Sequence, residues 1–311
     1  MAADDEFSPG AAPFGNFINY YSFNPPENRL KLLPAEFYTI IKKNCADRLL
    51  LGLDIGCNSG DLTAALLEQF LSHSTGDSHE DSSAALQTNR SPEDSTAALQ
   101  TTRSPEDSTA ALQTIRSPED STTALQTSRS PEDSTAALQT SQHTDFHIMG
   151  CDIDNILIQR AAENNRRTDR LTFQSLDYMS TEQRQETLGG YLQRFGRTKF
   201  DVTFCFSVTM WIHLQNGDSG LMDFLRSVSR WTRFLLLEPQ PWKCYRSAGR
   251  RLRKLGREGF PLLGTLQIRS DVEQVIDRCL KECSMTRVET FGETQWGRKL
   301  VLYHSKEEEL L

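Results

Sequence analysis

The sequence predicts an α/β fold built on a mostly parallel, seven-stranded sheet that ends in an antiparallel hairpin. The first observation is the apolar run at residues 49–55, which stops at the turn Gly-Cys-Asn-Ser-Gly and continues as an amphipathic segment. This order is typical of a buried parallel strand, a tight turn and a helix N-terminus. The second observation is that apolar runs and amphipathic segments then alternate along the chain, as in doubly wound sheets.

The elements follow from this periodicity, in which short apolar runs are bounded by polar or turn-forming residues. Parallel strands are expected at residues 49–55, 146–151, 171–175, 200–206 and 232–237. Helices are expected at residues 60–71, 155–167, 181–195, 217–229, 244–255 and 271–283. A final hairpin is expected from residues 287–291 and 299–304 around the glycine-bounded turn 292–297.

A 13-residue unit repeats from Ser82 and interrupts this pattern. The unit SSAALQTNRSPED is followed by three near-identical copies and the partial copy STAALQTSQ. Each unit offers one Leu and a few Ala, too little apolar surface for a stacked repeat, and a Pro in each full unit breaks a continuous helix. We therefore expect a disordered insertion at residues 76–144. Residues 1–13 are expected to be a flexible N-terminus, and the rest of residues 14–311 one folded domain.

The insertion accounts for the acidic character of the chain. Residues 77–145 hold 12 acidic and 4 basic residues, which equals the net charge of −8, and the remainder holds 30 residues of each sign. Within this neutral remainder, the segment KCYRSAGRRLRKLGR at 243–257 has seven basic residues and no acid. Such a run is either a solvated helix face or a contact for a nucleic-acid backbone.

Cysteine usage and hydropathy predict a cytoplasmic, soluble protein. The seven cysteines include no C-x-x-C pair, which is typical of a reducing compartment without disulfides. Cys279 and Cys283 lie four residues apart on an expected helix, which is more typical of core packing than of metal binding, so no metal is expected. The N-terminus has no secretory signal pattern, and no apolar run approaches membrane-spanning length.

Acidic residues lie near the carboxyl ends of the first three expected strands, where doubly wound sheets bind ligands. Asp54 stands in the pattern D-x-G-x-x-x-G, in which Gly56 lets the backbone approach a ligand. Sites for S-adenosylmethionine (SAM) place such an acid near the methionine end. Asp152 is positioned to accept hydrogen bonds from the ribose hydroxyls, and Asp177 from the adenine amino group, with Tyr178 beside the ring. The three acids indicate a Rossmann-like, class I SAM-dependent methyltransferase.

Three longer motifs narrow the family. They are FGNFINYYSFNPPENRLKLLP before the first strand, SVTMWIHLQNGD after the fourth and LEPQPWKCY after the fifth. Together they resemble the Bicoid-interacting family of RNA methyltransferases over nearly all of the chain outside the insertion. Some members methylate the γ-phosphate of a small nuclear RNA. Others methylate the 5′-monophosphate of cytoplasmic histidine tRNA and of some microRNA precursors.

The chain is more similar to the monophosphate branch. Met210 stands where the triphosphate branch has Lys, and PWKCYR stands where that branch has PWSSY. Gln215 departs from the usual HLN-x-GD pattern, which leaves its role open. The resemblance implies an RNA 5′-monophosphate methyltransferase with SAM as cofactor and the 5′ end of a tRNA or microRNA precursor as partner.

The resemblance also implies roles for single residues. The expected cofactor-binding residues are Arg29, which would bind the SAM carboxylate, and Asp54, Gly56, Asn58, Asp152, Asp177, Tyr178 and Cys205. The expected substrate-binding residues are Asn16, Tyr20, Tyr21, Trp242, Lys243 and Arg246, although the N-terminal aromatics fit a stapling role equally well. The expected positioning residues at the catalytic centre are Trp211, His213 and Glu238, and His213 fits either a phosphate donor or a structural histidine.

The expected reaction is in-line methyl transfer to a terminal phosphate oxygen, which needs no strong base because the second phosphate pKa is about 6. Other functions stay open. One is a methyltransferase of the same fold acting on an RNA 5′-triphosphate, a small molecule or a protein. Another is an RNA-binding module that no longer binds SAM, although Asp54, Gly56, Asp152 and Asp177 argue against it.

Overall fold

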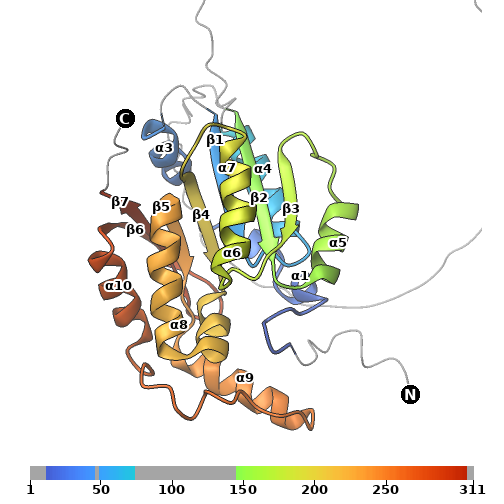
Figure 1. The fold of residues 1–311 in the computed structure, drawn as a ribbon, viewed down its shortest axis with the longest axis vertical. Helices are drawn as coiled ribbons and strands as arrows, with labels where there is room; N and C mark the ends of the chain where they lie inside the picture. Colours follow the sequence, from blue (N-terminus) through green and yellow to red (C-terminus); the bar gives the residue numbers. More distant parts are fainter. Residues whose placement is uncertain (1–11, 46–48, 74–144, 307–311) are drawn as a thin grey trace, which may run out of the picture. The chain divides into compact units, whose positions relative to one another are not determined.

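Seven strands form one sheet in the order β3-β2-β1-β4-β5-β7-β6 (Figure 1). The computed structural model describes residues 12–45, 49–73 and 145–306. The expected flexible N-terminus and the expected insertion therefore lie outside the described residues, except for Ala12 and Pro13. The strands are β1 (Leu50–Ile55), β2 (Phe146–Asp152), β3 (Leu171–Ser175), β4 (Phe200–Phe206), β5 (Thr232–Glu238), β6 (Met285–Glu293) and β7 (Lys299–Ser305).

The sheet confirms the predicted Rossmann-like, class I methyltransferase fold. β1 lies at the centre and pairs in parallel with β2 and β4, and β3 and β5 extend the parallel part on either side. β7 inserts antiparallel between β5 and β6, as the expected hairpin requires. Every residue of β1 is buried, which is why this strand reads as a nearly continuous apolar run in the sequence.

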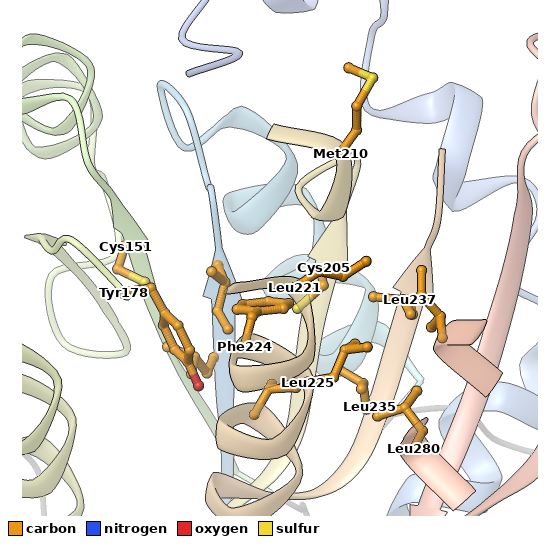
Figure 2. Packing of buried hydrophobic residues seen from close by; sticks show 14 of the residues in the cluster. Cys151, Tyr178, Cys205, Met210, Leu221, Phe224, Leu225, Leu235, Leu237 and Leu280 are labelled. Carbon is orange, nitrogen blue, oxygen red and sulfur yellow. The ribbon is translucent and has the colours of Figure 1, made fainter. Parts of the chain in front are cut away.

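Helices cover both faces of the sheet (Figure 1). They are α1 (Tyr20–Phe23), α2 (Glu27–Leu30), α3 (Ala35–Lys43), α4 (Asp61–Ser72), α5 (Asn155–Glu163), α6 (Thr181–Arg184), α7 (Gly190–Gln193), α8 (Thr209–Trp231), α9 (Trp242–Lys254) and α10 (Val272–Glu282), with a π-helical turn at Gln185–Gly189. The face with α6 to α8 buries one cluster, in which Phe224 of α8 lies near Cys205 of β4 (Figure 2). The other face buries a second cluster, in which Phe70 of α4 packs 4.3 Å from Phe146 between ring centroids.

Three local features differ from the sequence prediction. The segment after β4 is helical from Thr209, and a kink at Gly217, with φ of 72°, joins it to the predicted helix as one element, α8. α5 ends at Glu163, four residues early, and the Asn165 side chain instead bonds to the backbone at Arg167 and Leu171. The N-terminal motif forms two short helices, α1 and α2, and α3 follows it directly, none of which the sequence periodicity predicts.

The turn after β1 depends on two glycines in the left-handed region. Gly60 has φ of +81° and directly precedes α4. A Cβ at this position would lie 2.4 Å from the Phe173 ring and 3.1 Å from the Ala161 Cβ. Glycine at this position therefore lets α4 begin in close contact with β3 and α5.

Gly60→Ala is expected to lower the free energy of unfolding by about 2–4 kcal/mol, because it adds a steric clash to an unfavourable backbone conformation. Gly196→Ala is the matched control, since Gly196 also has a positive φ, of +65°, but a Cβ there would meet nothing within 4 Å. The control is expected to cost only about 1–2 kcal/mol. Equal losses in urea unfolding of both variants would show that Gly60 has no packing role.

Candidate functional site

A cavity of about 340 Å³ lies at the carboxyl ends of β1, β2 and β4. Residues from the N-terminal segment, from the turn after β1 and from the start of α8 complete its wall. Most of the expected site residues meet here. Those that line the cavity are Tyr20, Tyr21, Arg29, Asp54, Gly56, Asn58, Asp152, Asp177, Tyr178 and Trp211.

Asp54 is a buried carboxyl group at the base of this site. It is 2% exposed, and its Oδ2 accepts a hydrogen bond from Thr63 Oγ1 at 2.6 Å. No cation in the described part of the chain forms an ion pair with it. Burial raises the pKa of Asp54 to about 7. A buried carboxylate without a cationic partner is unfavourable in free energy, so this position is suited to a ligand that brings a positive charge.

Asp152 is held by the backbone at the end of β2. Its Oδ2 accepts from the Asn58 N–H at 2.9 Å, and its Oδ1 accepts from the Asp154 N–H at 3.0 Å. Burial raises the pKa of Asp152, although these two bonds favour its ionised form. Each carboxylate oxygen keeps a second lone pair, so Asp152 remains able to accept hydrogen bonds from ligand hydroxyls.

Asp177 and Tyr178 follow β3 and differ in accessibility. Asp177 is partly exposed, and its Oδ1 accepts from the Met179 N–H at 2.9 Å. Tyr178 is only 5% exposed and packs edge-on against Phe224, with ring centroids 5.2 Å apart. Figure 2 shows the Tyr178 ring near Phe224, in the core between sheet and helix. Tyr178 therefore contributes to the cavity wall mainly as a core residue.

The glycine turn is fixed by contacts on both of its sides. Gly56 has φ of +76°, and a Cβ there would lie 2.6 Å from Val208 Cγ2. Asn58 also has a positive φ, of 53°, and its side-chain N–H group donates to the Phe17 carbonyl at 3.0 Å. Gly56 thus permits close approach of the segment before α8, and Asn58 ties the turn to the N-terminal motif.

The N-terminal motif is stapled over the strand ends. Asn16 donates to Asp154 Oδ2 at 2.7 Å, and the Tyr21 hydroxyl donates to the Cys57 carbonyl at 3.2 Å. A Cβ at Gly15 would lie 2.3 Å from the Trp211 indole, so this glycine lets the motif lie flat against α8. Tyr21 therefore fits both roles expected for the N-terminal aromatics, because it fastens the segment to the glycine turn and also lines the cavity.

Gln215, the residue that departs from the family pattern, belongs to the same wall. Its side-chain N–H group donates to the Pro13 carbonyl at 2.8 Å. It also lines the cavity. The structure thus places position 215 where α8 meets the start of the described N-terminal segment, so its contribution is a contact between these two elements.

Arg29 and Glu238 form an ion pair that is almost fully buried. Arg29 Nε lies 2.6 Å from Glu238 Oε2, with exposed side-chain fractions of 1% and 0%. Arg29 Nη2 donates to the Tyr20 hydroxyl at 2.6 Å and to Ser207 Oγ at 2.9 Å. Arg298 adds a second cation, with Nη1 2.6 Å from Ser207 Oγ and 3.5 Å from Glu238 Oε1. Two arginines therefore share one carboxylate beside the cavity.

The match to known proteins identifies the family. Residues 200–305 match the family model described as Bicoid-interacting protein 3 (Bin3). The chain is 39% identical to the RNA 5′-monophosphate methyltransferase of Bos taurus over 96% of this chain and 82% of that protein. It is 38% identical to the pre-miRNA 5′-monophosphate methyltransferase of Xenopus laevis over 95% and 93%. The chain belongs to the Bicoid-interacting protein 3 family.

A third relative matches only a short segment. The chain is 48% identical to the 7SK snRNA methylphosphate capping enzyme of Mus musculus over 52 residues, which is 16% of this chain and 8% of that protein. The near-full-length matches thus go to the proteins named for monophosphate ends, as the resemblance in the three motifs implies.

In this family member, Cys205 does not line the cavity, contrary to expectation. The residue is fully buried and belongs to the cluster between the sheet and α8. Figure 2 shows it near Leu221 and Phe224. Side chains alternate along β4, so Phe206 reaches the cavity wall while Cys205 points to the opposite face.

Of the two roles expected for His213, a phosphate donor or a structural histidine, the structure supports the structural one. It is fully buried, its Nδ1 lies 3.0 Å from the Tyr245 hydroxyl, and its Nε2 lies 2.8 Å from Asp218 Oδ1. Burial lowers the pKa of His213. Asp218 also accepts from the Gln267 and Ile268 N–H groups. Both ring nitrogens are therefore engaged in joining α8, α9 and the segment after α9.

Several expected substrate and catalytic residues also lie off the cavity wall. The Asn16 side chain donates a hydrogen bond to Asp154. Glu238 is fully buried and forms ion pairs with Arg29 and Arg298, and it does not line the cavity. Trp242 packs against Tyr245 with tilted rings, whose centroids are 5.0 Å apart. Lys243 and Arg246 are exposed on α9. Of the three expected positioning residues, only Trp211 lines the cavity. Glu238 contacts the cavity wall only indirectly, through its ion pair with Arg29.

The expected contact of Arg29 with the SAM carboxylate also needs revision. Arg29 does line the cavity, but its Nε and Nη2 already donate to Glu238, Tyr20 and Ser207. These are the nitrogens that a bidentate contact requires. Arg29 therefore contributes positive charge and order to the wall, and a direct ligand contact would require it to exchange partners.

Sequence reasoning missed four residues that organise the site: Ser207, Gln240, Arg298 and Asp154. Ser207 has φ of 59° at the end of β4 and lines the cavity. Gln240 donates to the Ser207 carbonyl at 2.6 Å and accepts from the Met210 N–H at 3.0 Å. Ser207 and Gln240 lie inside the family motifs, which was a usable signal. Arg298 lies in the β6–β7 turn and had none.

The described residues show no group of three or more His, Cys, Asp or Glu arranged to hold a metal ion. Within the same ranges, no helix is long and apolar enough to cross a membrane. All seven cysteines are free.

The buried pair is expected to show strong coupling in a double-mutant cycle. Glu238→Leu and Arg29→Met should each lower the free energy of unfolding by about 3–5 kcal/mol, because each leaves a buried charge without its partner. The double variant should cost clearly less than the sum, as measured by urea unfolding. The exposed pair Arg226 and Asp223, 49% and 68% exposed, is the control and should show almost no coupling. Additive losses at Arg29 and Glu238 would contradict the importance of this pair.

Proposed function

We propose that the protein is an RNA 5′-monophosphate O-methyltransferase that transfers a methyl group from SAM to the terminal phosphate of RNA. The observation that carries the proposal is a single cavity with two different ends. Asp54, Asp152 and Asp177 lie at its β1–β3 end, and Arg29 and Ser207, backed by Arg298, lie at its β4–β5 end. The names of the near-full-length relatives support the same reaction.

The acidic end fits the methyl donor. Asp54 is a buried carboxyl group with a hydrogen bond from Thr63 but no ion-pair partner among the described residues, which suits the ammonium group of SAM. Asp152 has free acceptor capacity for the ribose hydroxyls, and Asp177 is accessible for the adenine amino group. When bound, SAM supplies an electrophilic methyl group on a positively charged sulfur. The three acids hold and orient it at the ends of three adjacent strands.

The other end fits a phosphate. Arg29 and Arg298 share the single carboxylate of Glu238, so this cluster keeps a net positive charge. Ser207 and Tyr20, which accept hydrogen bonds from Arg29, line the cavity together with it. A surplus positive charge with little exposure to water favours an anionic ligand nearby. It would attract a 5′-phosphate without surrounding each of its oxygens with donors.

Methyl transfer to a phosphate oxygen requires the protein mainly to position the two reacting groups. The second pKa of a phosphate monoester is about 6, so the attacking oxygen is already ionised at pH 7. No general base is required, which agrees with the position of His213 away from the cavity. The strand ends and the stapled N-terminal motif orient the reacting groups and exclude water, and such orientation accounts for most of the rate.

The substrates that fit this reaction are histidine tRNA and microRNA precursors with 5′-monophosphate ends, in the cytoplasm. The similarity to the pre-miRNA 5′-monophosphate methyltransferase of Xenopus laevis supports the second of these RNAs. Seven free cysteines agree with a reducing compartment.

Affinity for SAM is expected to rise as the pH increases through about 7. Below the pKa of Asp54, which burial raises to about 7, the carboxyl group is neutral and offers no charge to the ammonium group. The dissociation constant should therefore grow by up to about tenfold for each pH unit below this value. Calorimetric titration between pH 5.5 and 8.5 measures this. Asp54→Asn should bind weakly with a much smaller pH slope, and an equal slope in both proteins would refute the role of Asp54.

The reaction itself is tested with one RNA prepared with a 5′-hydroxyl, a 5′-monophosphate or a 5′-triphosphate. Labelled methyl from SAM is expected only on the monophosphate. Label mainly on the triphosphate would assign the other branch of the family. Equal label on all three would place the methyl on a base or ribose and would refute the proposal. No label on any RNA, combined with SAM binding in calorimetry, would point to a small-molecule or protein substrate.

A further inference from the structure

The exposed face of α9 carries a stripe of unpaired positive charge. Lys243, Arg246, Arg250, Arg253 and Lys254 are exposed, whereas Tyr245, Ala248, Gly249 and Leu252 form the buried face. Lys243, Arg246, Arg250 and Arg253 are spaced three or four residues apart, and Lys254 lies four residues after Arg250, so the five bases lie on one side of the helix. From Lys243 to Lys254 the stripe extends for about 16 Å at 1.5 Å per residue. Arg257 continues it just beyond the helix.

This stripe differs from an ordinary solvated helix face. None of its bases forms an ion pair with a carboxylate in the described part of the chain, and no acid occurs between residues 242 and 257. The exposed face of α10, in contrast, mixes Asp277, Arg278, Lys281 and Glu282. Like charges three and four residues apart destabilise a helix. α9 therefore keeps an unfavourable arrangement that an anionic partner would relieve.

The helix dipole does not explain the stripe. Basic residues in the last turn of a helix are favoured by the dipole, which accounts for Arg253 and Lys254. The same dipole disfavours bases in the first turns, where Lys243 and Arg246 lie, and the first turn has no acid. The charge along the whole helix thus indicates a binding surface.

The position of α9 joins this surface to the cavity. The helix begins four residues after Glu238, the last residue of β5, and Figure 1 shows it at the carboxyl edge of the sheet. The Arg251 guanidinium lies 5.1 Å from the centroid of the Phe17 ring, in the motif whose neighbours Phe14 and Gly15 line the cavity. A strand that enters the cavity by its 5′ end therefore has α9 beside its path.

We propose that the basic face of α9 binds the phosphate backbone of the RNA stem that follows the 5′ end. The inference rests on the proposed function and adds to it a second, sequence-independent contact outside the cavity. Basic side chains at regular spacing recognise backbone charge and carry no base specificity. The stem contact would raise affinity for structured RNA, and the cavity would select the phosphate.

The test removes charge from the distal, C-terminal part of the stripe, at three residues that do not line the cavity. The variant is Arg250→Gln, Arg253→Gln and Lys254→Gln, since Gln preserves helix propensity. The control is Arg166→Gln, Arg278→Gln and Lys281→Gln, which removes the same charge from exposed positions before β3 and on α10. The substrates are a 5′-monophosphorylated hairpin with a stem of about 12 base pairs, long enough to span the stripe, and a 5′-monophosphorylated trinucleotide.

The distal variant is expected to bind the hairpin at least tenfold more weakly in fluorescence anisotropy. The slope of log affinity against log salt should fall by about 2–3, because about three phosphate contacts are lost. Methylation of the trinucleotide and the thermal melting temperature should match wild type, and the control variant should behave as wild type throughout.

Other outcomes separate the two proposals. Unchanged hairpin affinity and salt slope in the distal variant would overturn the α9 proposal and leave an acidic protein as the remaining partner for this face. The proposed reaction would still stand if wild type methylated both RNAs. If wild type methylated neither RNA but the distal variant lost salt-dependent hairpin binding, the RNA surface would stand and the proposed reaction would fail. An equal loss in the control variant would mean that net charge alone is responsible, which would also overturn the α9 proposal.

Discussion

The buried ion pair between Arg29 and Glu238 is the constraint on which the site depends. It joins α2, in the N-terminal motif, to the last residue of β5 at 2.6 Å, with both side chains shielded from water. Removing such charges from water costs several kcal/mol per ion, so the pair is stable only while both partners and their hydrogen bonds stay in place. Tyr20, Ser207 and Arg298 supply those bonds. The order of the cavity wall therefore depends on this ion pair.

The ion pair also fixes the segments that follow β4 and β5. Ser207 accepts from both arginines and adopts a positive φ that is unusual for a residue other than glycine. Gln240 holds its carbonyl and also bonds to the first turn of α8. The strained end of β4 is thus fixed between the cluster and α8, which sets the position of Trp211 and Gln215 in the wall.

Acidic and basic side chains occupy separate regions of the molecule, and this arrangement matches the proposed reaction. Carboxyl groups gather at the ends of β1 to β3, a net positive cluster backs the ends of β4 and β5, and α9 extends this positive charge along the surface. A cationic methyl donor, a terminal phosphate and an RNA backbone would each meet the opposite charge. The chain outside residues 77–145 has no net charge, so this match depends on where the charges lie and not on their total.

Local pattern determined much of this protein. The apolar run of β1, its glycine turn and the acids Asp54, Asp152 and Asp177 are each set by short-range periodicity or strand position, so the sheet and the acidic end of the cavity were predictable. Tertiary structure alone decided which side chains face the cavity, because strand alternation turns Cys205 into the core and long-range bonds engage His213. It also brought Arg298 to Glu238 from 60 residues away, a contact that no local pattern encodes.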